Sequence, residues 1–434
     1  MNKLITILLL FFLLTSCSFN GKSGFWNETK KIKKEKEIKI KELFKKEDPH
    51  ENEVNVNLKI NLTSKLIKNS FINNFDNNNG RIDYDGNLKD ISKYKFSKID
   101  NFNEFEPDIV FDKDNVIFFD NKGSIIKFNN SSKIVWKQNY YSKVERKMKP
   151  ILFLSNNNDS LFVADNISKY YALDINSGKL LWSRNNTAPF NSQVKVYKDR
   201  IFVIDFENIL RCYSVKNGNE LWKIRTEKSF IKSQKKLSLV AVGDKIVFNN
   251  SIGDISAVDI DTGNLIWQQP TQSSEIYEDS FLLKTSDIIA SNKSILFSNN
   301  KNEFFSIDIN SGGIKWKQKI NSTLRHTLTD DIIFSISMEG FLIITNNKNG
   351  GIIRITDVFK QFSKKKRSKI KPVGFVVGAR NIYLTTDNGR LLIIDILTGK
   401  TKSVLKIDGE KISRPFVLNK NMFIIKDKAI IRLN

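Results

Sequence analysis

The sequence has few of the residues that most enzymes use for redox or metal chemistry. Among its 434 residues are only two cysteines, Cys17 and Cys212, and only two histidines, His50 and His326. It contains no adjacent Cys–Cys pair and no C-x-x-C-H motif. No nucleophile–base pair and no metal-ligand spacing stands out either. These scarcities argue against an enzyme, and we expect no cofactor and no metal site.

A membrane-spanning segment is also lacking. The predominantly apolar run Leu4–Leu14 has 11 residues, too few to cross a bilayer as a helix, and no later stretch is apolar enough. Lys3 precedes this run, and Leu14-Thr15-Ser16-Cys17 follows it, which indicates an N-terminal export signal. The last four residues resemble the bacterial lipobox. The alternative is an ordinary secretory signal with a chance cysteine.

The lipobox resemblance implies cleavage before Cys17 and lipidation of that residue. Residues 1–16 are then a lipoprotein signal peptide, and the mature protein is anchored to a membrane without crossing it. Ser18, rather than Asp, follows the cysteine. By analogy with lipoprotein sorting in enterobacteria, this favours the periplasmic face of the outer membrane. If lipid occupies Cys17, Cys212 has no partner, so we expect no intramolecular disulfide.

The chain is basic, with 70 Lys+Arg against 47 Asp+Glu and a net charge of +23. Lysines are scattered along it, and with the export signal this argues against nucleic-acid binding. Residues 17–55 include the Lys/Glu run Lys30–Lys46, whose composition cannot bury a core. We interpret them as a solvated tether, or alternatively as a contact with anionic lipid or a partner. Residues 56–93 are irregular, although Val54–Leu62 alternates and could form a strand.

The rest of the chain is dominated by one repeated pattern, A-x-D-x-x-[ST]-G-x-x-x-W. Consecutive copies end 38 to 49 residues apart, which is the period of a propeller or another repeat array. Three copies are strong, two are weaker, and two lack the tryptophan. In chain order they are Ile126–Trp136, Ala172–Trp182, Cys212–Trp222, Ala257–Trp267, Ser306–Trp316, Ile344–Arg354 and Ile393–Ser403.

One copy contains a strand, a turn and a second strand. Apolar residues alternate up to the Asp, as in a strand, and Asp-x-x-Ser/Thr-Gly forms a tight turn. The Asp residues at 174, 259, 308 and 395 are therefore expected to cap turns. The second strand ends in Trp, which is suited to packing between neighbouring sheets. We expect this structural role of the repeat tryptophans, Trp136, Trp182, Trp222, Trp267 and Trp316, with the last four of them buried between blades. We also expect Cys212 to fill a buried strand position.

Two further apolar strands precede each turn, so each repeat predicts one four-stranded propeller blade. After the seventh copy, Asn421–Ile425 and Ala429–Leu433 repeat the two middle strands, and the chain ends one strand short. Because an open ring exposes sheet edges, we expect Tyr94–Ile99 to supply the missing outer strand. The sequence thus predicts an all-β, eight-bladed β-propeller of four-stranded blades over residues 94–434, closed by an N-terminal strand. Seven blades is the alternative.

The lipobox, the tether and the repeats together resemble the BamB family of outer-membrane lipoproteins, within the pyrroloquinoline-quinone-like propeller superfamily. The resemblance covers residues 95–434. It implies a non-enzymatic scaffold, monomeric within a hetero-complex, that binds the BamA-like barrel subunit of the β-barrel assembly machine. The family's contacts are an apolar residue next to Arg and a Ser-Asp-x-Asp stretch. Ile231-Lys232 and Ser286-Asp287 match these positions here, with Lys in place of Arg and Ile289 in place of the second Asp.

Phe230, Ile231, Lys232 and Asp287 are accordingly the predicted partner-binding residues. Apolar Phe230 and Ile231 lie in a polar connection, and exposed apolar groups near charges often mark interfaces. Alternatively, these two residues begin the next strand and point inward. The basic run Lys364–Arg367 is a second candidate, either solvated or in contact with an acidic partner or lipid.

Two other functions share some of these features. Quinone-dependent alcohol dehydrogenases have similar repeats, but they use calcium ligands, often a Cys–Cys ring and sometimes a haem motif. A generic exported scaffold could instead bind the cell wall or another envelope protein through the propeller face.

Overall fold

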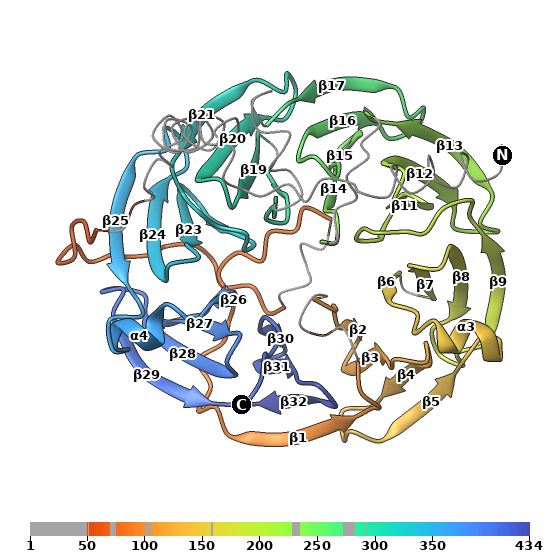
Figure 1. The fold of residues 1–434 in the computed structure, drawn as a ribbon, viewed down its shortest axis with the longest axis horizontal. Helices are drawn as coiled ribbons and strands as arrows, with labels where there is room; N and C mark the ends of the chain where they lie inside the picture. Colours follow the sequence, from red (N-terminus) through yellow and green to blue (C-terminus); the bar gives the residue numbers. More distant parts are fainter. Residues whose placement is uncertain are drawn as a thin grey trace, which may run out of the picture. The chain divides into compact units, whose positions relative to one another are not determined.

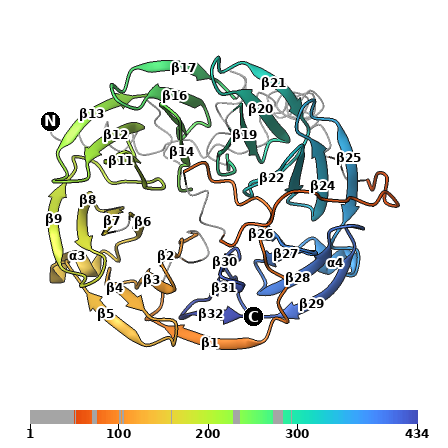
Figure 2. The ribbon, with the colours of Figure 1, turned by 180° about the vertical axis from the view of Figure 1, so that it is seen from behind.

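The computed structural model describes residues 50, 52–69, 75–99, 102, 106–157, 159–227, 235–271, 283–291 and 293–434. Within these residues, eight antiparallel four-stranded sheets form a ring (Figures 1 and 2). The first strand of each sheet lies nearest the centre and the last lies at the rim. The predicted eight-bladed β-propeller is confirmed, and the seven-bladed alternative is wrong.

The strands are assigned to blades in chain order. Blade 1 contains β2 (Val110–Asp112), β3 (Asn115–Phe119), β4 (Ile125–Phe128) and β5 (Ile134–Gln138), and blade 2 contains β6 (Leu152–Asn156), β7 (Ser160–Asp165), β8 (Lys169–Asp174) and β9 (Leu180–Asn185). Blade 3 contains β10 (Lys195–Tyr197), β11 (Arg200–Ile204), β12 (Ile209–Ser214) and β13 (Glu220–Arg225), and blade 4 contains β14 (Leu239–Val242), β15 (Lys245–Asn249), β16 (Ile255–Asp259) and β17 (Leu265–Gln269). Blade 5 contains β18 (Ile289–Ala290), β19 (Ser294–Asn299), β20 (Glu303–Asp308) and β21 (Ile314–Gln318), and blade 6 contains β22 (Thr327–Thr329), β23 (Ile332–Ile336), β24 (Phe341–Asn346) and β25 (Ile352–Asp357). Blade 7 contains β26 (Pro372–Val377), β27 (Asn381–Thr386), β28 (Arg390–Asp395) and β29 (Thr401–Lys406), and blade 8 contains β30 (Phe416–Leu418), β31 (Asn421–Ile425), β32 (Ala429–Leu433) and β1 (Asp90–Lys95). The described residues also form two short helices, α3 (Lys143–Lys147) and α4 (Lys364–Arg367), in connections between blades.

The ring is closed by β1, which pairs antiparallel with β32 and completes blade 8 (Figures 1 and 2). The strand begins at Asp90, four residues before the predicted Tyr94, and it ends at Lys95 rather than Ile99. Its outer position explains the difference, because a mostly exposed rim strand does not need apolar residues to alternate. Tyr94 is its one buried residue, and its ring contacts those of Phe128 and Phe423.

The turn of the repeat is held by its aspartate, as predicted. Asp174 accepts hydrogen bonds from the backbone N–H of Ser177 at 2.7 Å and from its hydroxyl at 2.6 Å. Asp259, Asp308 and Asp395 bind the equivalent Ser or Thr in the same way. Gly178 completes the turn with φ +71°, a conformation that costs glycine little. The predicted capping role of these aspartates is confirmed.

Each repeat tryptophan links its blade to the next one. The indole N–H donates to a backbone carbonyl just after the third strand of the next blade. The indole ring also covers the glycine in the turn of that blade, and a Cβ atom added to this glycine would lie under 3 Å from the ring. Trp136, Trp267 and Trp316 are buried, whereas Trp182 and Trp222 are half-buried, so the expectation of burial was wrong for those two. The five bonds join Trp136 to Ile175, Trp182 to Val215, Trp222 to Ile260, Trp267 to Ile309 and Trp316 to Asn347, at 2.9–3.2 Å.

Strand direction gives the ring two different faces. Turns within each blade between the first and second strands and between the third and fourth lie on one side, which we call the hairpin face. Connections between the second and third strands and between blades lie on the other, which we call the crossover face. The residue that immediately precedes each blade's first strand therefore lies at the crossover face, beside the central channel.

The described residues before β1 pack across the hairpin face and reach into the ring centre (Figure 1). Isolated bridges join Val54 to Ile355, Asn69 to Leu418, and Arg81 to Val377, but Val54–Leu62 forms no strand. Between these contacts, residues 75–79, the channel loop, lie beside the inner strands. The backbone carbonyls of Phe75 and Asp76 accept hydrogen bonds from Ala241 and Ala290 of blades 4 and 5.

Asn77 fixes the channel loop to three blades at once. Its amide nitrogen lies 3.1 Å from Gln193 Oε1, 3.2 Å from Ser238 Oγ and 2.9 Å from the carbonyl of Ile288. Its amide oxygen accepts a 2.6 Å hydrogen bond from Lys195 Nζ. The side chain is buried, so these bonds satisfy polar groups that would otherwise be desolvated without a partner.

Candidate functional site: the crossover-face mouth of the channel

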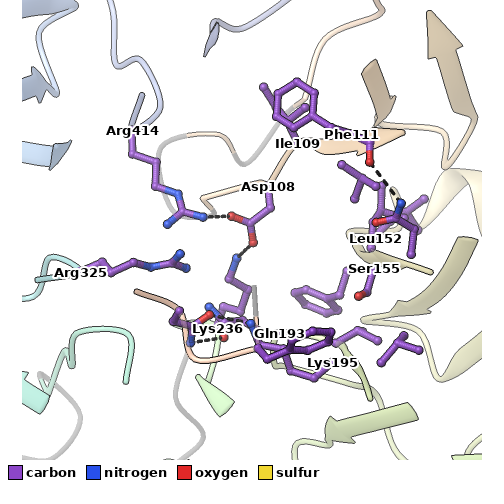
Figure 3. A pocket seen from close by; sticks show the side chains of 18 of the residues that line it. Asp108, Ile109, Phe111, Leu152, Ser155, Gln193, Lys195, Lys236, Arg325 and Arg414 are labelled. Carbon is purple, nitrogen blue, oxygen red and sulfur yellow. Dashed lines mark hydrogen bonds and ion pairs between the residues drawn. The ribbon is translucent and has the colours of Figure 1, made fainter. Parts of the chain in front are cut away.

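Five charged residues from five blades meet at the crossover-face mouth of the channel. Each lies a few residues before the first strand of its blade, so the repeat brings them together although they are far apart in sequence. We call them the mouth cluster: Asp108, Lys236, Asp287, Arg325 and Arg414. Figure 3 shows Lys236 and Arg414 directed at Asp108, with Arg325 beside them.

Ion pairs connect the whole cluster. Arg414 Nη2 lies 2.6 Å from Asp108 Oδ1, and Lys236 Nζ binds the other oxygen of the same carboxylate. Arg325 binds Asp287 through Nε at 2.9 Å and Nη2 at 2.5 Å. Arg414 Nη1 also lies 3.9 Å from Asp287 Oδ2 and so links the two pairs. Because planar guanidinium groups form directional, bidentate contacts with carboxylates, this network fixes the positions of its members.

The cations keep both aspartates ionised. Burial alone would raise the pKa of Asp287, but Arg325, Arg414, Lys236 and Lys235 hold it far below its usual range. Burial would also raise the pKa of Asp108, but Lys236, Arg414 and Arg325 hold it well below its usual range. Burial, with Arg414 next in effect, lowers the pKa of Arg325. The mouth therefore holds ionised carboxylates within a strongly cationic environment.

A second set of charges lies deeper, where the channel loop meets β10. Burial, with Arg325 next in effect, lowers the pKa of Lys195 to about 7 against the opposing effect of nearby aspartates. Burial raises the pKa of Asp76 in the channel loop to about 6. These two groups change charge near neutral pH, unlike the aspartates of the mouth cluster.

Two cavities surround these charges. One, of about 240 Å³, lies between the channel loop and the inner strands of blades 1 to 3. The other, of about 480 Å³, lies toward blades 5 to 7 and is lined by Lys235, Lys284 and Asp287 among others. Asp108, Lys236 and Arg414 border both cavities, so the mouth cluster stands between them.

The structure places only one of the four predicted partner-binding residues. Phe230, Ile231 and Lys232 lie outside the described residues, and so does Cys17. Asp287 is described, and its side chain is 17% exposed and bound to Arg325. It belongs to the mouth cluster rather than to a freely projecting loop.

Sequence reasoning missed the other members of the cluster. Asp108 and Arg414 are 306 residues apart, and no local motif marks either one. The usable signal was their common position just before the first strand of a blade, which comparison of the repeats could have revealed. The other basic candidate, Lys364–Arg367, forms helix α4, where Arg367 binds Asp357 and lies over the Phe341 ring.

The rare Cys and His residues of the propeller are both buried. Cys212 lies in β12 as predicted, and burial raises the pKa of its thiol to about 12, so it is protonated at neutral pH. His326 lies immediately before β22 and is buried between the hydroxyls of Ser298 and Ser335. In the described part of the chain, no group of three or more His, Cys, Asp or Glu side chains could hold a metal ion.

The described helices are too short and too polar to cross a membrane. This observation covers only the residues that the structure places, and the predicted export signal lies outside them.

Known proteins resemble this chain in sequence and in fold. A family model described as outer membrane protein assembly factor BamB matches residues 121–356. A relative of that name from Shewanella oneidensis is 28% identical over 152 residues, which are 33% of this chain and 34% of the relative. The matched part thus spans about a third of the relative's length.

Solved structures show the same propeller. The crystal structure of BamB from Moraxella catarrhalis superposes with a TM-score of 0.66 at 13% identity, over 80% of this chain and 100% of the other. Quinohemoprotein alcohol dehydrogenase from Comamonas testosteroni superposes with a TM-score of 0.61 at 10% identity, over 81% of this chain and 78% of the other. At such low identity, both likenesses concern the fold alone.

Proposed function

The chain belongs to the family of outer membrane protein assembly factor BamB, and we propose that it serves as a non-enzymatic scaffold in the assembly of outer-membrane β-barrel proteins. The observation that carries this proposal is the family match over residues 121–356, more than half of the chain. The partner we propose is the BamA-like barrel subunit of the assembly machine. The chain would act as one copy within that hetero-complex.

We place the partner surface on the crossover face, around Asp287 and the connection that contains Phe230, Ile231 and Lys232. Two features support this choice. The connections before β14 and β18 belong to neighbouring blades and lie on the same face. Lys235, near the end of the first connection, donates to the backbone carbonyls of Thr285, in the second connection, and of Thr323, in the connection before β22.

The ion pairs of Asp287 refine how such a surface would work. Its carboxylate is already bound to Arg325 and lies near Arg414. We therefore expect Asp287 to position these arginines for the partner rather than to bind a cation of the partner by itself. Arginine suits this role because its planar group can bind a carboxylate through two hydrogen bonds at once.

A lipid anchor at Cys17 would hold this surface at the periplasmic face of the outer membrane. The Leu14–Cys17 pattern supports the anchor, and residues 17–55 would serve as the tether between lipid and propeller. The proposed location agrees with the family, whose description names the outer membrane.

Co-purification from detergent-solubilised membranes tests the proposed function. The tagged wild-type protein should recover a large β-barrel protein with periplasmic repeats. Ile231→Ala, Lys232→Glu and Asp287→Asn should each reduce recovery, since loss of an interface anchor can cost about 2 kcal/mol, or roughly thirtyfold in affinity. Asp331→Asn is the matched control, because Asp331 is 62% exposed and lies in a turn of the hairpin face.

Wild-type recovery by all three folded variants would place the partner surface elsewhere, with Lys364–Arg367 as the next candidate. Recovery of cell-wall fragments or a transporter, instead of a barrel protein, would favour a general envelope scaffold. Thermal unfolding of each variant shows whether reduced recovery reflects the interface or misfolding.

A further inference from the structure

The smaller cavity has two chemically different ends. Its volume of about 240 Å³ exceeds that of an engineered cavity of about 150 Å³ that admits benzene. Figure 3 shows Arg325, Arg414, Lys236 and Asp108 on one side of the space and Phe111, Leu152 and Ser155 on the other. The walls come from the inner strands of three blades and from the channel loop.

Positive charge exceeds negative charge at the charged end. Among the residues that the structure describes, four cationic side chains, Lys195, Lys236, Arg325 and Arg414, line the cavity with one carboxylate, that of Asp108. The lining thus carries 4 − 1 = 3 positive charges when Lys195 is protonated. The carboxylates of Asp287 and Asp76 do not line the cavity, but they also interact with Lys195 and offset two of these positive charges. While Lys195 is protonated, one positive charge therefore remains unbalanced among these groups, in a site that is largely removed from solvent.

Such a surplus favours an anion. Removing charges from water is costly unless opposite charge and hydrogen bonds compensate, and like charges close together add to that cost. The depressed pKa of Lys195, caused by burial and then by Arg325, reports this unfavourable environment. An anion near Lys195 and Arg325 would offset both effects and would accept hydrogen bonds from their N–H groups.

The opposite end would accommodate an apolar body. Leu152, Phe153 and Leu154 of β6 and Val196 of β10 border the cavity, with Phe75 of the channel loop. Ligand sites commonly combine such apolar walls with a few convergent polar groups. We propose that this cavity binds a small organic anion, whose carboxylate or phosphate lies against Lys195, Arg325 and Arg414 and whose apolar body lies against β6 and β10.

The mouth cluster would control entry to this site. The larger cavity shares Asp108, Lys236 and Arg414 with the smaller one, and it continues toward blades 5 to 7. The channel loop occupies the space beside blades 3 to 6, where Asn77 and Asn78 bind Ser238, Ile288 and Leu328. A ligand would therefore enter from the crossover face.

Three probes of the full-length protein in detergent test the proposal. Benzene-1,2-dicarboxylate has both a charged and an apolar part, inorganic phosphate has only charge, and benzyl alcohol has only the apolar part. Titration calorimetry and ligand-induced shifts in Tm should show saturable binding of the dicarboxylate, at least about tenfold tighter than either other probe. No saturable binding of the dicarboxylate, or binding no tighter than that of phosphate, would overturn the proposal.

Variants locate the site. Ser155→Leu adds bulk to the cavity wall without changing its charge, and it should abolish binding of the dicarboxylate. Arg414→Gln should weaken binding at least about tenfold, since it removes a charge-assisted hydrogen bond to the anion. Lys284→Gln is the control, because Lys284 borders only the larger cavity and is exposed. Unchanged dicarboxylate binding by a folded Ser155→Leu protein would sink the assignment, even if Arg414→Gln fails to fold.

Discussion

Arg354 donates from Nη2 to the backbone carbonyl of Ile396 at 3.1 Å, and so makes the bond that a tryptophan makes in the five preceding repeats. Its guanidinium also lies against the turn glycine of the next blade, Gly399, where a Cβ would be 2.9 Å from Nη2. Unlike the indole, the guanidinium has further donors, and Arg354 Nη1 binds the carbonyl of Leu58 at 2.8 Å. Because Arg354 stands where the five preceding repeats have a tryptophan, it joins blade 6 both to blade 7 and to the N-terminal segment.

Replacement of Arg354 by Met should loosen the N-terminal segment. The change keeps apolar bulk but leaves the buried carbonyl of Ile396 without its donor and removes the bond to Leu58, at a cost of about 1–3 kcal/mol. Limited proteolysis should then cut within residues 52–69 faster than in the wild type. Equal cleavage rates would mean that the bridge from Val54 to Ile355 and the pairing around Ile60 hold the segment without Arg354.

Truncation of Trp267 should destabilise the propeller more than truncation of Trp182. Trp267 is buried, and its indole donates to Ile309 at 2.9 Å, so Trp267→Ala should lower the free energy of unfolding by about 3–5 kcal/mol. Because Trp182 is half-buried, Trp182→Ala should lower the free energy of unfolding by less. Chemical denaturation measures both, with Ile266→Ala as the control because that neighbouring side chain is 42% exposed. Similar losses in all three variants would contradict a specific role of the indole.

Much of the fold could be predicted because the repeat encodes it locally. In four of the repeats, the Asp of the turn accepts hydrogen bonds from a residue three positions later, and the turn glycine takes positive φ, so the motif alone specifies the hairpin. The number of blades followed from counting repeats and from the missing outer strand at the chain end. The position of that strand was less certain, since Asp90-Ile91-Ser92-Lys93 at the rim carries no alternating pattern.

The candidate site could not be predicted in the same way, because it depends on contacts between distant parts of the chain. Asn77 lies in a polar stretch that looks like a loop, yet it binds Gln193, Ser238 and Ile288, up to 211 residues away. Asp287 was selected, but its bond to Arg325 was not foreseen. Burial of Lys195 likewise follows from the channel loop rather than from its own short strand.

Purified protein supplied with calcium and a quinone cofactor should oxidise no alcohol. The sequence offers neither a Cys–Cys pair nor a haem motif, and the charged side chains at the channel mouth are bound to one another. Spectrophotometric assays with an artificial electron acceptor measure this, with a quinone-dependent dehydrogenase as the positive control. Saturable turnover would overturn the proposed non-enzymatic function, whereas quinone binding without turnover would not.

Replacement of Cys17 by Ser should release the protein from membranes. We expect the mature wild-type chain to begin at Cys17 with acyl chains attached, and each buried CH₂ contributes about 0.8 kcal/mol to membrane binding. Fractionation of the native host should find the variant in the soluble periplasmic fraction, while Cys212→Ser stays with the membrane. Mass spectrometry of the wild type provides the independent check, since an unmodified N-terminus elsewhere would refute the anchor.

His326 should make stability depend on pH. Ser298 donates its hydroxyl to the carbonyl of Ser322 at 2.8 Å, so toward His326 Nε2, at 2.7 Å, it acts as the acceptor. Ser335 then donates to Nδ1 at 2.8 Å, and the imidazole is neutral. Burial accordingly lowers the pKa of His326 from 6.5 to about 3.

The sign of the effect follows from proton uptake. Between pH 6.5 and 3, the unfolded chain binds a proton at His326 and the folded chain does not, so the stability from this residue is complete above pH 6.5 and is lost as pH falls. The uptake of one proton changes the free energy of unfolding by at most about 1.4 kcal/mol per pH unit. Asp76 and Asp165, whose pKa values burial raises to about 6, titrate in the same range, so the test must compare two proteins. Urea denaturation from pH 7.5 to 5 should show the advantage of the wild type over His326→Gln shrinking as pH falls; parallel curves would show that His326 takes up its proton equally in both states.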